Sequence, residues 1–165
     1  MSTLIIVESY FGNTLQIAHA TADALPNTQT QGSNEMPVTD RRRPQFDEAP
    51  DAIPDDIDLL LLGAPTHETA LPSPKSRHSA ATRSSAGSTN RVQPPPQRGL
   101  AEWAKHATIP AGTRTITFDT SAGRFATMFG CAAKAAAKQL RTRGFQVERG
   151  PSFTVTGGDV LATGQ

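Results

Sequence analysis

Residues 4–14 read LIIVESYFGNT, and this stretch decides how the rest of the chain is interpreted. The apolar segment 4–7 is typical of a buried strand, whereas the apolar residues between Ile17 and Leu25 recur at helical spacing. A short polar turn separates the two segments, and Pro26 and Asn27 end the helical pattern. The sequence therefore predicts a strand, a turn and a helix in direct succession.

The turn is predicted to bind an anion. It consists of Ser9, Tyr10, Phe11, Gly12, Asn13 and Thr14. The first N–H groups of a helix have no partner within the helix and carry partial positive charge, which suits a phosphate. The turn has no lysine and lacks the glycine spacing of triphosphate or dinucleotide sites, so a phosphate monoester held by neutral donors fits better. The alternative is that its Ser, Asn and Thr side chains only cap the helix.

Composition bounds the fold and the partners. A chain of 165 residues with 36% hydrophobic and 5% aromatic residues predicts one domain with an aliphatic core. A net charge of +1 provides no general attraction to nucleic acid or to an anionic membrane, and the basic run 41–43 is interpreted as solvated surface. The single cysteine, Cys131, excludes an internal disulfide and a thiolate-rich metal site, and we expect it to be buried. With no signal segment or long apolar run, the expected location is the cytoplasm.

Strand and helix patterns alternate along the chain. Strands are predicted weakly at 29–38, as an edge strand, and firmly at 59–62, where four leucines predict burial on both faces. Further strands are predicted at 114–118 and at 145–155, the last broken at Gly150 and Pro151. Helices are predicted at 99–105, with Trp103 in the core, and at 130–143, with Gly144 as the cap. This alternation predicts a three-layer α/β domain.

Periodicity disappears between residues 72 and 98. This segment is rich in Ser, Pro, Arg and Thr and has no acidic residue. We predict a single domain over residues 1–165 with a disordered insert at 72–98. Docking of an anionic partner to this basic segment is the alternative interpretation.

With these residues in place, the chain resembles the flavodoxin family. Residues 9–14 resemble the family's phosphate loop, and Gly12, Asn13 and Thr14 match its second half. Residues 59–67 and 115–124 resemble its third and fourth strands with the loops that cover the two sides of the flavin. The resemblance implies a flavodoxin-like three-layer sandwich with a five-stranded parallel sheet of order 2-1-3-4-5. In such sheets the ligand lies at the carboxyl ends of the strands where the order reverses.

The resemblance implies flavin mononucleotide (FMN) as the cofactor. Ser9, Thr14 and the backbone of the turn would hold its phosphate. One edge of the flavin ring would lie against Pro65, Thr66 and His67, and the other against Asp119, Thr120, Ser121, Ala122 and Gly123. No catalytic residue and no metal ligand is predicted, because the redox chemistry belongs to the flavin. As alternatives, His67 is an exposed surface residue and Asp119 starts a turn.

Three departures from the family pattern shape the functional hypotheses. Phe11 stands where the family usually has a hydroxyl residue, and neither ring loop contains Trp or Tyr. After residue 155 the chain leaves no room for the family's last helix, so we expect a partner subunit or a longer chain to cover the exposed sheet face. Homodimerisation is one hypothesis for that cover.

The leading hypothesis is an FMN-binding electron-transfer protein that exchanges electrons with a redox partner protein or a small-molecule acceptor. The sequence leaves open whether it is an enzyme. One alternative is an FMN-dependent NAD(P)H:quinone reductase of the same fold, in which the basic segment 72–98 meets the nicotinamide cofactor. The other is a flavin-free interaction module.

Overall fold

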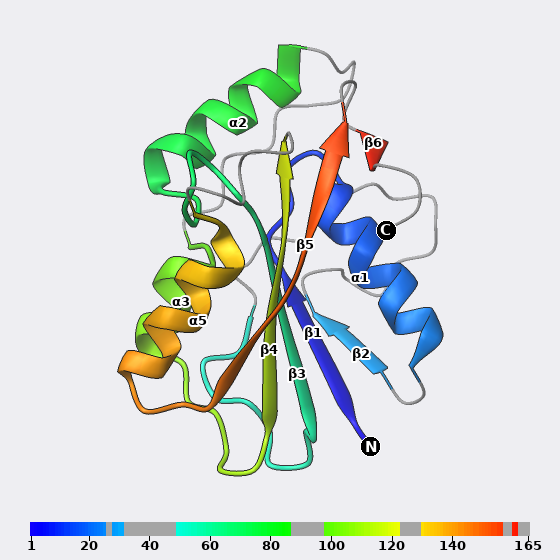
Figure 1. The fold of residues 1–165 in the computed structure, drawn as a ribbon, viewed down its shortest axis with the longest axis vertical. Helices are drawn as coiled ribbons and strands as arrows, with labels where there is room; N and C mark the ends of the chain where they lie inside the picture. Colours follow the sequence, from blue (N-terminus) through cyan, green and yellow to red (C-terminus); the bar gives the residue numbers. More distant parts are fainter. Residues whose placement is uncertain (26–27, 32–48, 87–97, 123–129, 157–159, 162–165) are drawn as a thin grey trace.

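The computed structural model describes residues 1–25, 28–31, 49–86, 98–122, 130–156 and 160–161. Helices and strands alternate along most of this chain, and α1 lies on one face of a central sheet while α3 and α5 lie on the other (Figure 1). The elements are, in order, β1 (Thr3–Val7), α1 (Asn13–Ala24), β2 (Thr28–Gln31), β3 (Leu59–Pro65), α2 (Pro74–Ala86), α3 (Leu100–His106), β4 (Arg114–Ala122), α5 (Ala132–Thr142), β5 (Val147–Thr156) and β6 (Val160–Leu161). The predicted three-layer α/β arrangement is confirmed.

The sheet has six strands in the order β2-β1-β3-β4-β5-β6. Strands β1 to β5 are parallel, and their order agrees with the predicted 2-1-3-4-5. The predicted count of five was too low, because the two-residue β6 pairs antiparallel with the end of β5. A strand this short leaves no readable period in a sequence. The predicted edge strand is present at 28–31, and the rest of its range, 32–38, lies outside the described residues.

The core lies on both faces of the central strands. Leu60 and Leu62 pack in the cluster that includes α3 and α5, whereas Leu59 and Leu61 pack in the cluster that includes α1. Burial on both faces explains why β3 shows a continuous apolar run rather than alternation. Trp103 of α3 is fully buried as predicted, and its Nε1 donates a hydrogen bond of 2.7 Å to the carbonyl of Pro50.

Helix α5, Ala132–Thr142, begins later than the predicted start at 130 and ends beside the predicted cap. Cys131 is buried immediately before the first turn. At the other end Gly144 has a φ of 91°, a conformation that glycine adopts without steric cost. The N–H of Gly144 donates to the carbonyl of Arg141 at 2.9 Å, and that of Phe145 donates to Leu140 at 3.2 Å. This pair of hydrogen bonds is the Schellman motif, which satisfies carbonyls at the end of a helix.

Strand β5 is continuous where the sequence predicted a break. The β4–β5 register shifts between Thr117 and Asp119, so the β-bulge at Gly150 and Pro151 is accommodated within the strand. A Cβ at Gly150 would lie 2.8 Å from the carbonyl oxygen of Thr117, so a side chain at this position would clash with β4.

The prediction of a disordered insert at 72–98 was wrong over residues 74–86, which form helix α2. Ser73 precedes the helix, its Oγ accepts a hydrogen bond of 3.1 Å from the N–H of Ser76, and Pro74 occupies the first helical position. Among the side chains described in α2, Arg77 and Ala80 are buried, and Arg77 pairs with Glu102 at 2.9 Å, so a charged contact stands where an apolar stripe was absent from the sequence pattern. Residues 87–97 lie outside the described residues.

The sheet face expected to be exposed is the one that α1 covers. Towards β4 and β5 this face carries Ile116 and Phe153, both half-buried and packed against the α1 cluster. Among the described helices, α1 is the one that contacts this cluster. Cover by a second subunit stays a prediction.

The fold predicts a severe effect of Gly63→Ala. A Cβ there would lie 2.3 Å from the nearest ring atom of the buried Phe118. We expect this overpacking to lower the free energy of unfolding by about 1–3 kcal/mol. Urea unfolding followed by fluorescence of the single tryptophan measures the change. Adding Phe118→Leu to Gly63→Ala should recover part of the loss; no recovery would contradict the steric explanation.

Candidate functional site

The ends of β1, β3 and β4 meet at one edge of the sheet. The hydroxyls of Thr14 and Thr120 are 2.8 Å apart, the N–H of Thr66 donates to the carbonyl of Thr120 at 2.7 Å, and the rings of Tyr10 and His67 have centroids 5.4 Å apart. Strand β1 has β2 on one side and β3 on the other, so the strand order reverses here. We call residues 9–14, 65–70 and 119–122 the switch-point site, because such positions bind ligands in open α/β sheets.

The start of α1 has no side-chain cap. Gly12 precedes the helix with a φ of 91°, and no described side chain accepts a hydrogen bond from the first turn. Ser9 and Asn13 are each 6% exposed, and Ser9 Oγ and Asn13 Oδ1 have no hydrogen-bond partner in the part of the chain that the structure describes. The structure therefore contradicts the alternative in which side chains of the turn only cap the helix. A buried polar atom without a hydrogen-bond partner destabilises a protein. Two such oxygens beside the first N–H groups of a helix therefore indicate a position where a ligand binds.

The two aromatic residues of the turn differ in exposure. Tyr10 is 5% exposed, and its hydroxyl donates to Glu8 Oε1. Its side chain packs in the interior, and its contact with a cofactor stays a prediction. Phe11, in contrast, is 42% exposed, and its ring lies at the surface of the turn.

The predicted loop at 119–124 was wrong at its start, because β4 continues through Ala122. Thr120 and Ser121 are buried and pair with β5, so their backbones belong to the sheet. Asp119 is fully buried, and its Oδ2 accepts a hydrogen bond of 2.8 Å from the N–H of Ala133. One carboxylate oxygen thus caps α5, while Oδ1 has no hydrogen-bond partner among the described residues, and contact of Asp119 with a ligand stays a prediction. Gly123 lies outside the described residues.

The end of β3 contributes half-buried side chains to the switch-point site. Pro65, Thr66 and His67 are all of intermediate exposure. The Thr66 hydroxyl accepts a hydrogen bond of 2.9 Å from the N–H of Ala132, so Thr66 and Asp119 together serve the start of α5. Nδ1 of His67 lies 3.0 Å from Ser76 Oγ of α2, which contradicts the alternative of an isolated surface histidine.

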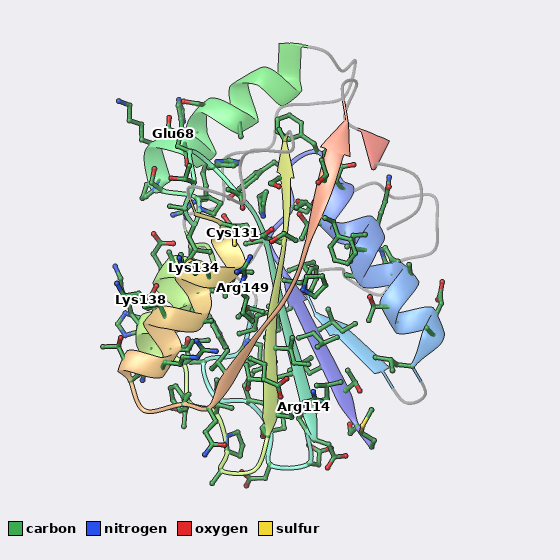
Figure 2. All side chains as sticks on the ribbon, in the orientation of Figure 1. Glu68, Arg114, Cys131, Lys134, Lys138 and Arg149 are labelled. Carbon is green, nitrogen blue, oxygen red and sulfur yellow. The ribbon has the colours of Figure 1, made fainter. Side chains whose placement is uncertain are left out.

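A strained turn follows β3. The backbones of His67 and Ala70 exchange two hydrogen bonds of 3.0 Å, as in a two-residue hairpin. The two central residues, Glu68 and Thr69, have φ values of 51° and 79°. Such turns normally carry Asn-Gly, because positive φ is unfavourable for a β-branched residue. Figure 2 shows Glu68 beside the start of α2, with Arg114 towards the opposite end of the sheet.

Sequence reasoning missed two charged residues next to the site, Glu8 and Arg77. Their exposed fractions are 2% and 0%. Burial raises the pKa of Glu8, while hydrogen bonds from Tyr10 and from the N–H of Leu100, together with Arg77, favour its charged form. The available signal was a glutamate directly after an apolar strand; Arg77 lay in a segment without periodicity.

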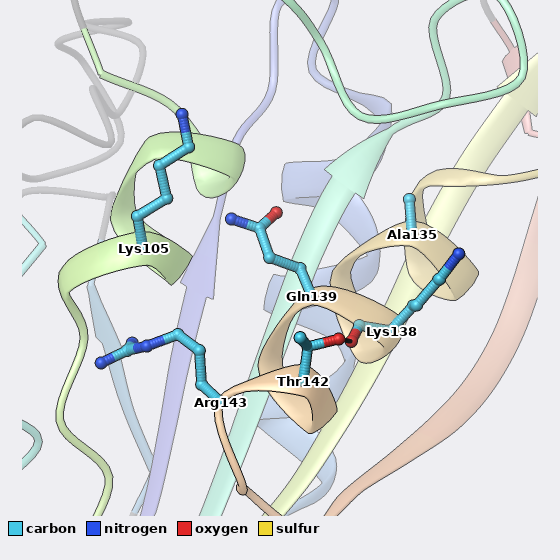
Figure 3. A pocket seen from close by; sticks show the side chains of 6 residues that line it. All are labelled: Lys105, Ala135, Lys138, Gln139, Thr142 and Arg143. Carbon is cyan, nitrogen blue, oxygen red and sulfur yellow. Dashed lines mark hydrogen bonds between the residues drawn. The ribbon is translucent and has the colours of Figure 1, made fainter.

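A hollow of about 500 Å³ lies between α3 and α5 (Figure 3). Its lining residues are Lys105, Ala135, Lys138, Gln139, Thr142 and Arg143. Gln139 donates to the carbonyl of Ala101 at 2.8 Å, and Arg143 donates to Ala104 at 3.0 Å and to Ala107 at 2.6 Å. These polar groups join the two helices, so the hollow is a feature of helix packing.

Among the described residues, no group of three or more His, Cys, Asp or Glu side chains could hold a metal ion. No described helix is both long and apolar enough to cross a membrane.

Comparisons with known proteins add one weak similarity. No family model matches the chain, and no curated protein matches it. Among solved structures, the chain is similar to a flavoprotein from Lactobacillus acidophilus NCFM, whose crystal structure is a complex with FMN. The identity is 15%, the alignment covers 93% of this chain and 92% of that chain, and the TM-score is 0.44. We draw nothing about the switch-point site from a similarity of this size.

Tyr10, the single tyrosine, predicts a pH dependence. Burial and the neighbouring Glu8 raise its pKa, so the folded protein holds the phenolic proton more tightly than the unfolded chain does. The free energy of unfolding should therefore fall as the pH rises above about 10, the pKa of an exposed tyrosine. Ultraviolet absorbance should detect tyrosinate near pH 10 in urea but only at higher pH in the folded protein. Equal titrations would contradict this environment, and Tyr10→Phe should remove its contribution to the slope.

The strained turn predicts that Thr69→Gly is stabilising. Glycine tolerates the positive φ, and we expect a gain of about 1 kcal/mol in the free energy of unfolding. Thr108 is a matched control, because it is exposed and lies outside the left-handed region, so Thr108→Gly should destabilise. Chemical denaturation of both variants gives the comparison. A loss of stability in Thr69→Gly would show that the turn carries no relievable strain.

Proposed function

We propose that the chain binds FMN at the switch-point site and transfers electrons to and from a redox partner protein or a small-molecule acceptor. The observation that carries the proposal is the start of α1, where Ser9 Oγ, Asn13 Oδ1 and the first N–H groups of the helix find no hydrogen-bond partner among the residues that the structure describes. This set has the chemistry of a site for a phosphate monoester.

The phosphate end of FMN fits the residues present. Ser9 can donate its hydroxyl proton, and rotation of the Asn13 amide presents an N–H₂ donor in place of the unpartnered oxygen. Gly12, with no Cβ, keeps the backbone open to close approach, and a Cβ built there would meet nothing within 4 Å. Thr14, predicted from the sequence as a phosphate contact, would act through its backbone N–H while its hydroxyl meets Thr120.

The ring end of FMN would rest on fewer side chains than the sequence implied. Pro65 and His67 are half-buried at the end of β3, and the exposed Phe11 offers an aromatic surface from the turn. These residues would orient the ring and exclude water from one side of it. Bound FMN would supply the reversible uptake of electrons, which no side chain of this chain provides.

The proposal predicts that FMN binds more tightly than riboflavin, which lacks the phosphate. Ser9→Ala should weaken FMN binding by about tenfold or more, the scale of one hydrogen bond to a charged group, and leave riboflavin unchanged. Quenching of flavin fluorescence measures all the affinities.

Thr3→Val is the matched control for Ser9→Ala. It also removes a buried hydroxyl without a partner, but at the opposite end of β1. FMN affinity should be unaffected. Equal affinities of the native protein for FMN and riboflavin would contradict the phosphate site, and a folded protein that binds neither would favour the flavin-free interaction module.

A further inference from the structure

A buried carboxylate lies at the end of β1, next to the switch-point site. Oε1 of Glu8 accepts a hydrogen bond from the hydroxyl of Tyr10, and Oε2 accepts one of 2.9 Å from the N–H of Leu100. Both oxygens face donors, which is the arrangement of an ionised carboxylate. One side chain thus joins β1, the turn at 9–14 and the start of α3.

The counter-ion comes from α2. Arg77 Nη1 lies 3.8 Å from Glu8 Oε1 and 2.9 Å from Glu102 Oε2, and it donates to the carbonyl of Pro72 at 2.9 Å. A Cβ at Gly99 would lie 2.6 Å from Arg77 Nη1 and 2.7 Å from either oxygen of Glu8, so only glycine leaves room for these charges.

These contacts form a closed circuit, in which each residue contacts or neighbours the next and the last contacts the first. Glu8 bonds to Tyr10, the Tyr10 ring packs on His67, and His67 meets Ser76, the residue before Arg77 on α2. Arg77 then returns to Glu8. This circuit of contacts passes through the turn after β1, the end of β3 and α2, so it includes two of the three segments of the switch-point site.

We propose that Glu8 and Arg77 are positioning residues of the switch-point site, whose ion pair fixes the turn at 9–14 and the segment 65–70 in their mutual arrangement before a ligand arrives. The identity of that ligand, FMN, rests on the proposed function; the positioning does not. Neither charged group needs to touch the ligand. A site whose segments are ordered before the ligand arrives binds more tightly, because no binding free energy is lost in ordering them.

The test is amide hydrogen exchange in residues 9–14 and 65–70 of the ligand-free protein. Arg77→Met leaves Glu8 buried without its counter-ion and should speed exchange in both segments by about tenfold relative to a control of equal global stability. Leu140→Ala provides that control, because Leu140 is fully buried in α5 and is not part of the circuit of contacts. Similar exchange in the two variants would overturn the proposal.

Tyr10→Phe is the milder variant in case Arg77→Met does not fold. It removes the hydroxyl that bonds Glu8 but keeps a ring against His67, and it buries no new charge. Faster exchange in both segments, by a smaller factor, supports the proposal; unchanged exchange in segment 65–70 counts against it.

A double variant separates positioning from stability. Glu8→Gln combined with Arg77→Met removes both charges, so it should recover part of the global stability that either change alone loses. Exchange in the two segments should nevertheless stay faster than in the native protein, because the ion pair that completes the circuit of contacts is absent. Exchange restored together with stability would assign these residues a purely structural role.

Ligand binding provides the second readout. If the native protein binds FMN, Arg77→Met should weaken that binding by about tenfold without any loss of a phosphate contact, and riboflavin binding should weaken as well. Unchanged FMN affinity would overturn the positioning role. If the native protein does not bind FMN, the proposed function fails, while the exchange measurements still decide the positioning proposal.

Discussion

The ion pair between Glu8 and Arg77 is the constraint on which the carboxyl edge of the sheet depends. A buried charge without a partner costs several kcal/mol, so the buried carboxylate of Glu8 requires the cation of Arg77, which also pairs with Glu102 at 2.9 Å. These contacts join β1, α2 and the start of α3. The three charges therefore constrain where α2 lies.

The interior of the sheet could be predicted from the sequence because its residues act locally. The leucines of β3 and the apolar run of β1 indicate strands without any knowledge of their neighbours in the fold. Gly144 ends a helix through its own conformation. Three signals were present but overlooked: Ser73 and Pro74 mark the start of α2, and Glu8 follows a buried strand. The hydrophobic period, on which most of the predictions depend, gives no signal for a helix whose buried side chains, over its described part, are Arg77 and Ala80.

The candidate site was predicted in outline but not in the use of its side chains. Gly12 and the unpartnered Ser9 and Asn13 lie where the turn was expected, because strand, turn and helix are consecutive in the chain. The Thr66 hydroxyl and Oδ2 of Asp119 also accept hydrogen bonds from the start of α5, which follows β4 in sequence, and the sequence did not indicate this use. Whether a polar side chain serves a ligand or a neighbouring helix depends on contacts between distant segments, and a motif does not contain that information.

The bulge at Gly150 and Pro151 also bears on self-association. An open sheet exposes unpaired backbone groups along its outer strands, and these invite strands from other molecules. Here β2 comprises four residues, while β5 is bent by its bulge, carries a proline with no N–H to offer, and has β6 paired antiparallel near its end. Over the described residues, neither lateral edge is a long, regular template for intermolecular strand addition, so these two edges resist the first step of β-aggregation.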